Sequence, residues 1–145
     1  MSYWDTSALL KLYVPEPDSP EFVEYVRNHP DAVTARLAAW EALTAFRRKE
    51  AEGIIKPGAA PSLHEALLQD GQAGFWRWVE LSPAVEVAFG QVLDHGFQLK
   101  PPLVVRTLDA IHLACARATG ETEIVATDRR LRAVAKGLGH TLFPR

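Results

Sequence analysis

Four acidic side chains in this sequence have the type and placement to act together. Asp5 and Asp128 each stand where a strand-like stretch ends and a helical pattern begins. Glu41 interrupts an apolar helix face, and Asp109 lies in the first turn of another helical segment. A buried carboxylate needs a cation, a hydrogen-bond network or a raised pKa. We see no matching basic residue nearby in sequence, so the four acids predict a site for a hard divalent ion such as Mg²⁺ or Mn²⁺.

Each acid also has a simpler explanation. Asp5 and Asp128 could serve only as helix N-caps, which contribute about 1 kcal/mol each. The helix dipole alone favours Asp109 near a helix N-terminus, and Glu41 could lie at the edge of an apolar stripe. None of these explanations accounts for acids at all four places in one short chain, although for each acid taken singly the simpler explanation stays open.

The elements that would position these acids alternate along the chain. We predict short strands at 2–4, 31–35, 78–82, 122–128 and 140–143. We predict helices at 6–13, 18–28, 36–53, from 62 onward, and at 82–97, 106–120 and 129–139. The helix starts rest on cap residues and capping-box pairs, namely Asp18 with Glu21, Ser62 with Glu65, Ser82, and Thr107. Strands separated by helices throughout predict an α/β fold with a parallel sheet.

Length and composition limit the class of protein. With 145 residues, of which 48% are hydrophobic, the chain is expected to form one domain over residues 1–145. It has no apolar run of about 18 residues and no basic leader, so we predict neither a membrane span nor a signal peptide, and expect a cytoplasmic location. Cys115 is the one cysteine, so no internal disulfide or zinc cluster is expected. The net charge of −2 means that nucleic-acid binding would depend on local basic patches.

Four segments carry the four acids in order: YWDTSALLKLY, AAWEALTAFRR, RTLDAIHLACA and ATDRRLRAVAKGLG. Together they resemble the signature segments of the PIN-domain nucleases, most closely the VapC-type toxins of bacterial and archaeal toxin–antitoxin pairs. The resemblance spans nearly the whole chain. It implies a three-layer α/β/α sandwich around a central, mainly parallel sheet. Segment 62–82 matches no motif of the family, and its role is left open.

The resemblance also implies an acidic pocket for Mg²⁺ or Mn²⁺, made by Asp5, Glu41, Asp109 and Asp128. Ser7 would hydrogen-bond the acids from the side. We expect direct metal contacts from Asp5 and Asp109, and a direct or water-mediated one from Asp128. Glu41 would position the attacking water or a second ion.

The resemblance implies a metal-dependent endoribonuclease. A coordinated water of lowered pKa would attack the RNA phosphodiester in line and leave a 5′-phosphate and a 3′-hydroxyl. Because such an enzyme would harm its own cell, the resemblance implies a cognate antitoxin protein that covers the site. It also suggests a homodimer.

Basic residues would have to guide an RNA backbone into an acidic pocket. Arg106 lies shortly before one of the acids, and a basic cluster directly follows another, namely Arg129, Arg130, Arg132 and Lys136. We predict Arg106 and this cluster, above all Arg129 and Arg130, as contacts to RNA phosphates. For any one of them taken singly, a solvated helix face is the simpler explanation.

Two kinds of side chain require a separate interpretation. Trp4 and Trp40 fall on core-facing patterns and are predicted to pack rather than to stack on bases, while Trp76 and Trp78 are left open. His112 follows one turn after an acid. It is predicted to be a packed or hydrogen-bonded core histidine rather than a metal ligand.

Other classes of protein use some of the same residues. A haloacid-dehalogenase-type phosphatase also begins with an Asp after its first strand, but it needs a second Asp where this chain has Ser7. A non-catalytic RNA- or protein-binding module with the same fold is the second candidate, and metal titration with an RNA cleavage assay would separate the two. A DNA-directed nuclease of the same superfamily is a further alternative.

Overall fold

A five-stranded sheet forms the centre of the molecule. The computed structural model describes residues 1–145, and its strand order is β3-β2-β1-β4-β5. The strands are β1 (Ser2–Trp4), β2 (Ala32–Ala35), β3 (Trp76–Val79), β4 (Glu123–Val125) and β5 (Thr141–Phe143). Every neighbouring pair is parallel, which confirms the predicted α/β fold with a parallel sheet.

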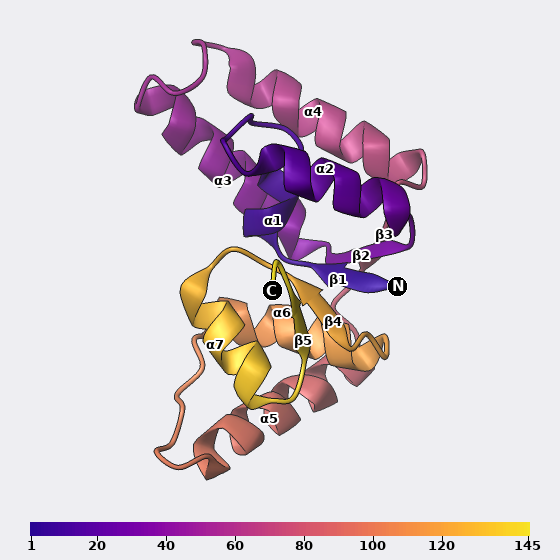
Figure 1. Cartoon of the computed structure of the whole chain (residues 1–145), viewed down its shortest axis with the longest axis vertical. Coiled ribbons are helices and arrows are strands. Elements are labelled where there is room, and N and C mark those ends of the chain that lie inside the picture. The colour runs from indigo at the N-terminus through magenta and orange to yellow at the C-terminus, as the bar shows by residue number, and fades with distance from the viewer.

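Helices cover both faces of this sheet (Figure 1). On one face lie α1 (Thr6–Leu10), α2 (Ser19–Asn28), α3 (Leu37–Ala51) and α4 (Ala59–Gln72). On the other lie α5 (Pro83–Gln98), α6 (Thr107–Ala118) and α7 (Arg129–Gly137). Each face has its own apolar core, and successive residues of β1 alternate between them, with Tyr3 in one and Trp4 in the other. The predicted three-layer α/β/α sandwich is therefore confirmed.

The strand order determines where a site can form. The chain leaves β1 toward β2 and β3 on one side of the sheet, and later returns to β4 and β5 on the other. The carboxyl ends of β1 and β4 therefore lie side by side where the direction of winding reverses. Ligands bind at such a switch point in open parallel sheets, because the loops there diverge and leave a crevice.

Helix α4 begins at Ala59, so the predicted start at Ser62 is wrong. Ser62 lies inside the helix and cannot cap it. Gly58, with φ of +82°, takes the left-handed conformation that leads the chain into α4. The cap comes from another helix, because Oε1 of Glu50 in α3 accepts a hydrogen bond from the Ala60 N–H at 3.1 Å. A local capping pattern carries no sign of such a long-range partner.

Two other predicted caps are also wrong, whereas Ser82 does cap α5. Asp18 makes no capping bond to α2, because its carboxylate instead pairs with Nζ of Lys11 at 2.8 Å. Thr107 is the first residue of α6 rather than its cap. The residue in the cap position is Arg106, whose side chain does not cap the helix.

Helix α3 buries several alanines and Phe46 but not its tryptophan. Ala38, Ala42 and Phe46 are fully buried, whereas the Trp40 side chain is 62% exposed. This face packs against α1 and α4, where alanines allow the backbones to approach closely. The predicted packing role is therefore wrong for Trp40 and confirmed for Trp4, which is 1% exposed.

The other two tryptophans belong to β3, which lies at 76–79 rather than at the predicted 78–82. Trp76 is buried. Trp78 packs so closely over Gly71 of α4 that a Cβ there would collide with its indole ring. The guanidinium of Arg36 lies 4.9 Å from the centre of the Trp78 ring. Both tryptophans therefore pack at this edge of the sheet.

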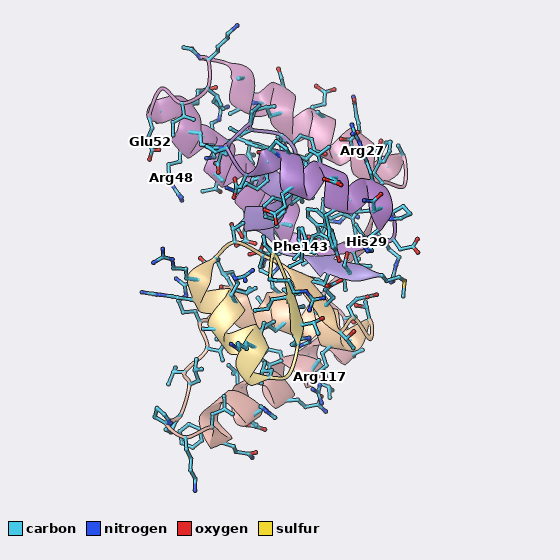
Figure 2. The ribbon with its side chains drawn as sticks, viewed as in Figure 1. Arg27, His29, Arg48, Glu52, Arg117 and Phe143 are labelled. Atoms are coloured by element: carbon cyan, nitrogen blue, oxygen red, sulfur yellow. The ribbon has the colours of Figure 1, made fainter.

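The last strand is anchored to the N-terminal half of the chain. Phe143 of β5 stacks on Tyr25 of α2 with ring centres 3.8 Å apart, and Tyr25 stacks on His29 at 4.2 Å. Figure 2 shows Phe143 and His29 close together between β5 and α2. None of the helices combines the length and the apolar character needed to span a lipid bilayer.

Candidate active site

The four predicted acids line a single cleft of about 370 Å³ at the carboxyl ends of β1 and β4. Asp5 directly follows β1, and Asp128 lies between β4 and α7. Glu41 projects from α3 and Asp109 from the first turn of α6. The remaining lining residues are Thr6, Ser7, Arg106, Thr107, Leu108, His112 and Leu131. The structure thus brings together side chains from four distant segments.

Asp5 is both a helix cap and a buried member of this cleft. Its residue is only 4% exposed. Oδ1 accepts the Ala8 N–H at 2.9 Å and so caps α1, and the Ser7 hydroxyl lies 2.7 Å from both carboxylate oxygens. Burial raises the pKa of Asp5 from 3.8 to about 6, although His112 and these hydrogen bonds oppose the shift. A cation nearby would therefore stabilise the ionised form.

Ser7 connects the two strand ends. Its hydroxyl donates to Asp5 and accepts the backbone N–H groups of Thr127 at 3.0 Å and Asp128 at 3.2 Å. One side chain thereby fixes the distance between the segment after β1 and the segment after β4. This contact places Asp128 at the cleft.

The Asp109 carboxylate has a cationic partner within the cleft. Oδ2 of Asp109 accepts a hydrogen bond from Nε of Arg106 at 2.9 Å, and Nη2 of Arg106 lies 3.8 Å from Oδ1 of Asp128. The hydrogen bond to Asp109 raises the pKa of Arg106. The expectation that no basic residue matches the acids is therefore wrong: Arg106, in the N-cap position of α6, is three positions before Asp109.

Glu41 is held by a chain of hydrogen bonds that begins in β1. The Tyr3 hydroxyl oxygen accepts the Ala35 N–H at 3.2 Å and lies 2.7 Å from Nδ1 of His112. In neutral His112, Tyr3 then donates its proton to Nδ1, and Nε2–H donates to Oε1 of Glu41 at 2.6 Å. Thr6 donates to the same oxygen at 2.7 Å.

This chain determines the charge and orientation of Glu41. Burial alone would raise the pKa of Glu41, but the hydrogen bond and charge of His112, with the Thr6 hydroxyl, outweigh it and lower the pKa. Glu41 is therefore held ionised. The prediction of a hydrogen-bonded core histidine is confirmed, because His112 is only 3% exposed.

Sequence reasoning missed the roles of Tyr3 and Thr6, and it did not connect His112 to Glu41. The sequence contains only weak signals for these roles. Thr6 stands between two predicted site residues, and His112 lies three positions after Asp109, on the same face of α6. Which acid His112 contacts depends on how α3 and α6, on opposite faces of the sheet, are placed relative to one another at its carboxyl edge, and local spacing does not contain that information.

Three of the carboxylates leave one oxygen free. Oε1 of Glu41 and Oδ2 of Asp109 accept the bonds described above, and Oδ1 of Asp128 accepts the N–H groups of Arg130 and Leu131. The second oxygen of each accepts no hydrogen bond from the protein. Each carboxylate is thus oriented through one oxygen while the other remains available as a ligand.

These donors fit a hard divalent ion of the Mg²⁺ type. Carboxylate oxygens are its preferred protein ligands. No group of three or more His, Cys, Asp or Glu side chains is arranged to hold one ion together. Mg²⁺ usually takes one or two carboxylates and keeps several waters, so a complete protein cage is not required. The donor chemistry fits, with water and a substrate phosphate completing the coordination.

The predicted basic residues divide into two groups. Arg106 lines the acidic cleft. Arg129 and Arg130, in the first turn of α7, are exposed, do not line this cleft, and form no ion pair. Only Arg106 therefore lies at the acids themselves.

Comparison with known proteins agrees with this fold and cleft. The sequence model of the PIN domain family matches residues 2–137. Over 139 residues, covering 94% of this chain and 92% of the relative, the sequence is 34% identical to "Ribonuclease VapC46" of Mycobacterium tuberculosis. The chain therefore belongs to the PIN domain family, among its VapC-type members.

Solved structures support the same fold at lower sequence identity. VapBC2 from Rickettsia felis, bound to a DNA fragment from its promoter, matches with a TM-score of 0.68 and 12% identity, over 98% of this chain and 97% of that chain. VapC20 from Mycobacterium tuberculosis, a toxin that cleaves the sarcin–ricin loop, matches with a TM-score of 0.65 and 16% identity, over 92% and 94% of the two chains. At these identities the likeness concerns the fold alone.

Proposed function

We propose that this protein is a Mg²⁺- or Mn²⁺-dependent endoribonuclease and the toxin of a toxin–antitoxin pair that acts in the cytoplasm. The observation that carries the proposal is the set of four carboxylates around one cleft, three of which leave one oxygen free. The 34% identity to a protein named as a ribonuclease supports the reaction class.

Each acid has a separate role in the proposed reaction. Asp5 and Asp109 hold the ion, and Asp128 completes the site directly or through a water. When bound, the ion lowers the pKa of a water and offsets negative charge on the scissile phosphate. Oε2 of Glu41 is free to orient the attacking water and accept its proton, because Oε1 is already occupied. The products are a 5′-phosphate and a 3′-hydroxyl.

The arginines would hold the RNA backbone. Arg106 lies at the acids and can contact the scissile phosphate or its neighbour. Arg129 and Arg130 are exposed at the start of α7, where they can contact phosphates outside the cleft.

The partners are proposed from the relatives and the surface. Several structural neighbours are toxin–antitoxin complexes, which supports a cognate antitoxin that covers the acidic cleft. A homodimer would bury exposed apolar residues around that cleft: Leu108 lines it, and the 62% exposed Trp40 precedes Glu41. Light scattering on the purified chain would report the mass in solution.

The proposal is tested by incubating the purified chain with cellular RNA in buffers containing Mg²⁺, Mn²⁺ or EDTA. We expect cleavage only with the metal, and fragments whose 5′ ends carry a phosphate. Cleavage that continues in EDTA would contradict the proposed chemistry. RNA binding without cleavage in any metal would favour a non-catalytic binding module instead.

Replacing His112 by Leu should lower cleavage about 10- to 100-fold, as removing a residue that orients an active-site carboxylate typically does. Glu41 loses the hydrogen bond from His112, so the pKa of Glu41 rises and the acid limb of the pH–rate profile moves to higher pH. His112→Gln can still donate to Glu41 and should recover part of the rate. If His112→Leu lowers the rate without moving the acid limb, His112 does not act through Glu41.

Replacing Arg106 by Gln should have opposite effects on two ligands. The variant frees Oδ2 of Asp109 and removes a nearby positive charge, so Mn²⁺ should bind several-fold more tightly. RNA should bind more weakly, since a phosphate contact is lost. Calorimetry with Mn²⁺ and fluorescence anisotropy with labelled RNA in EDTA measure the two effects, and weaker Mn²⁺ binding would contradict this interpretation.

A further inference from the structure

A second cleft lies between α7 and β5 and is strongly basic. Its volume is about 460 Å³, and four of its eight lining residues are cationic: Arg129, Arg132, Lys136 and Arg145. The others are Ala133, His140, Thr141 and Leu142, so no acidic side chain lines it. The whole chain carries a net charge of −2, and this concentration of positive charge is therefore a local feature.

The four cations are not neutralised within the protein. No ion pair of the structure includes any of them. Arg132 is fixed in place, because its guanidinium donates to the carbonyl oxygens of Ala126 at 2.8 Å and Pro144 at 2.7 Å. It thereby holds the segment after β5 against α7. Arg129, Lys136 and Arg145 are exposed and free to contact a ligand.

Positive charges that line one cleft repel one another, and an anion bound between them would relieve that repulsion. Both walls of the cleft are anchored. Arg132 joins α7 to the C-terminal segment, and Phe143 stacks on Tyr25 of α2. Arg129, Arg132 and Lys136 therefore line the α7 wall of a concave surface, and Arg145 belongs to the C-terminal segment that forms the other wall.

The position of this cleft indicates which anion it takes. Arg129 directly follows Asp128, which lines the acidic cleft, so the two clefts lie next to each other at the start of α7. From Arg129 to Lys136 the basic surface follows α7 for about 10 Å, at 1.5 Å of rise per residue. A chain of phosphates leaving the acidic cleft along α7 would thus meet successive cations.

We propose that this basic cleft binds the RNA backbone beyond the cleaved bond, with Arg129, Lys136 and Arg145 contacting phosphates and Arg132 positioning the wall. The inference rests on the proposed function. It assigns the direction in which the RNA leaves the acids, and it places the binding determinants in the C-terminal segment.

The test measures binding of a single-stranded RNA oligonucleotide in EDTA over a range of salt concentrations. Each phosphate contact to single-stranded nucleic acid contributes about 0.7 to the slope of log K against log salt. The double variant Lys136→Gln/Arg145→Gln should bind more weakly, with a slope shallower by about 1.4 if both contacts are lost. The matched control Lys56→Gln/Arg77→Gln removes the same charge from exposed, unpaired residues elsewhere, and should change the slope much less.

The melting temperature of the double variant should be unchanged or slightly raised, because repulsion between like charges is reduced. Equal slopes for the double variant and the control, with a wild-type chain that binds and cleaves RNA, would overturn this proposal alone. If the double variant keeps its RNA slope and instead loses affinity for the partner protein, the cleft binds an acidic protein segment and the RNA assignment is wrong. A wild-type chain that neither binds nor cleaves RNA would overturn both proposals.

Discussion

Replacing Asp5 by Asn is expected to abolish metal-dependent RNA cleavage while making the folded protein more stable. Asp5 lines the acidic cleft and would provide a negative charge for the ion. An active-site metal supplies several kcal/mol of charge stabilisation in the transition state, so its loss should lower the rate by at least about 10²- to 10³-fold. Asn keeps an oxygen that can accept the Ala8 N–H, so α1 remains capped.

The stability effect follows from the pKa of Asp5, which burial raises from 3.8 to about 6. Because the folded state favours the protonated form, this contribution to stability is fully present below pH 3.8 and is lost as the pH rises through about 6. In metal-free buffer at pH 7.5, the neutral Asn should therefore stabilise the fold by about 1–3 kcal/mol.

Denaturant unfolding between pH 4 and pH 7.5 measures this effect. The wild-type free energy of unfolding should fall relative to that of Asp5→Asn as the pH rises. Asp31→Asn, a matched change at an exposed aspartate before β2, should alter neither stability nor cleavage. An Asp5→Asn protein that is less stable than the wild type at pH 7.5 would contradict the assignment of a costly buried charge.

Replacing Ser7 by Ala should damage both the fold and the reaction, without removing any charge. The Ser7 hydroxyl donates to Asp5 and accepts the N–H groups of Thr127 and Asp128. Its removal leaves these N–H groups without a partner, at a cost of about 1–3 kcal/mol. Asp128 also loses the contact that places it at the cleft. Cleavage should fall about 10- to 100-fold, as is typical when a residue supporting metal ligands is removed.

Ser82→Ala provides the matched control for this change. Ser82 caps α5 through the Val85 N–H at 3.3 Å and has no contact with the acids. It should lower stability by about 1 kcal/mol and leave cleavage per folded molecule unchanged. If Ser7→Ala behaves in the same way, Ser7 is only a structural link between the strand ends.

The parts of the fold that depend on local pattern were predictable from the sequence. The strands are short apolar runs, and the helices are periodic segments between turn residues. Their alternation along the chain predicts a parallel sheet with helices on both faces. Asp5 and Asp128 could be placed because a residue that follows a parallel strand lies at the carboxyl edge of the sheet. Glu41 and Asp109 were singled out because acids are rare among the apolar residues around them.

The missed features depend on contacts between distant segments. The start of α4 depends on Glu50 in α3, and the orientation of Glu41 depends on Tyr3 through His112. The prediction that Trp40 packs in the core is wrong because a 3.6-residue period shows which residues share a helix face. It does not show which of two neighbouring faces is buried. Packing against α4 decides that question.

Direct binding of Mn²⁺ is the simplest test of whether the acids around Asp5 hold a divalent ion. Calorimetric titration at pH 7.5 should show saturable binding to the wild-type chain. Asp31→Asn should bind in the same way, and Asp5→Asn should lose this binding together with RNA cleavage. Equal Mn²⁺ binding by the wild type and Asp5→Asn would show that Asp5 does not hold the ion. Cleavage by a wild-type chain that binds no divalent ion would show that the reaction does not depend on such a site.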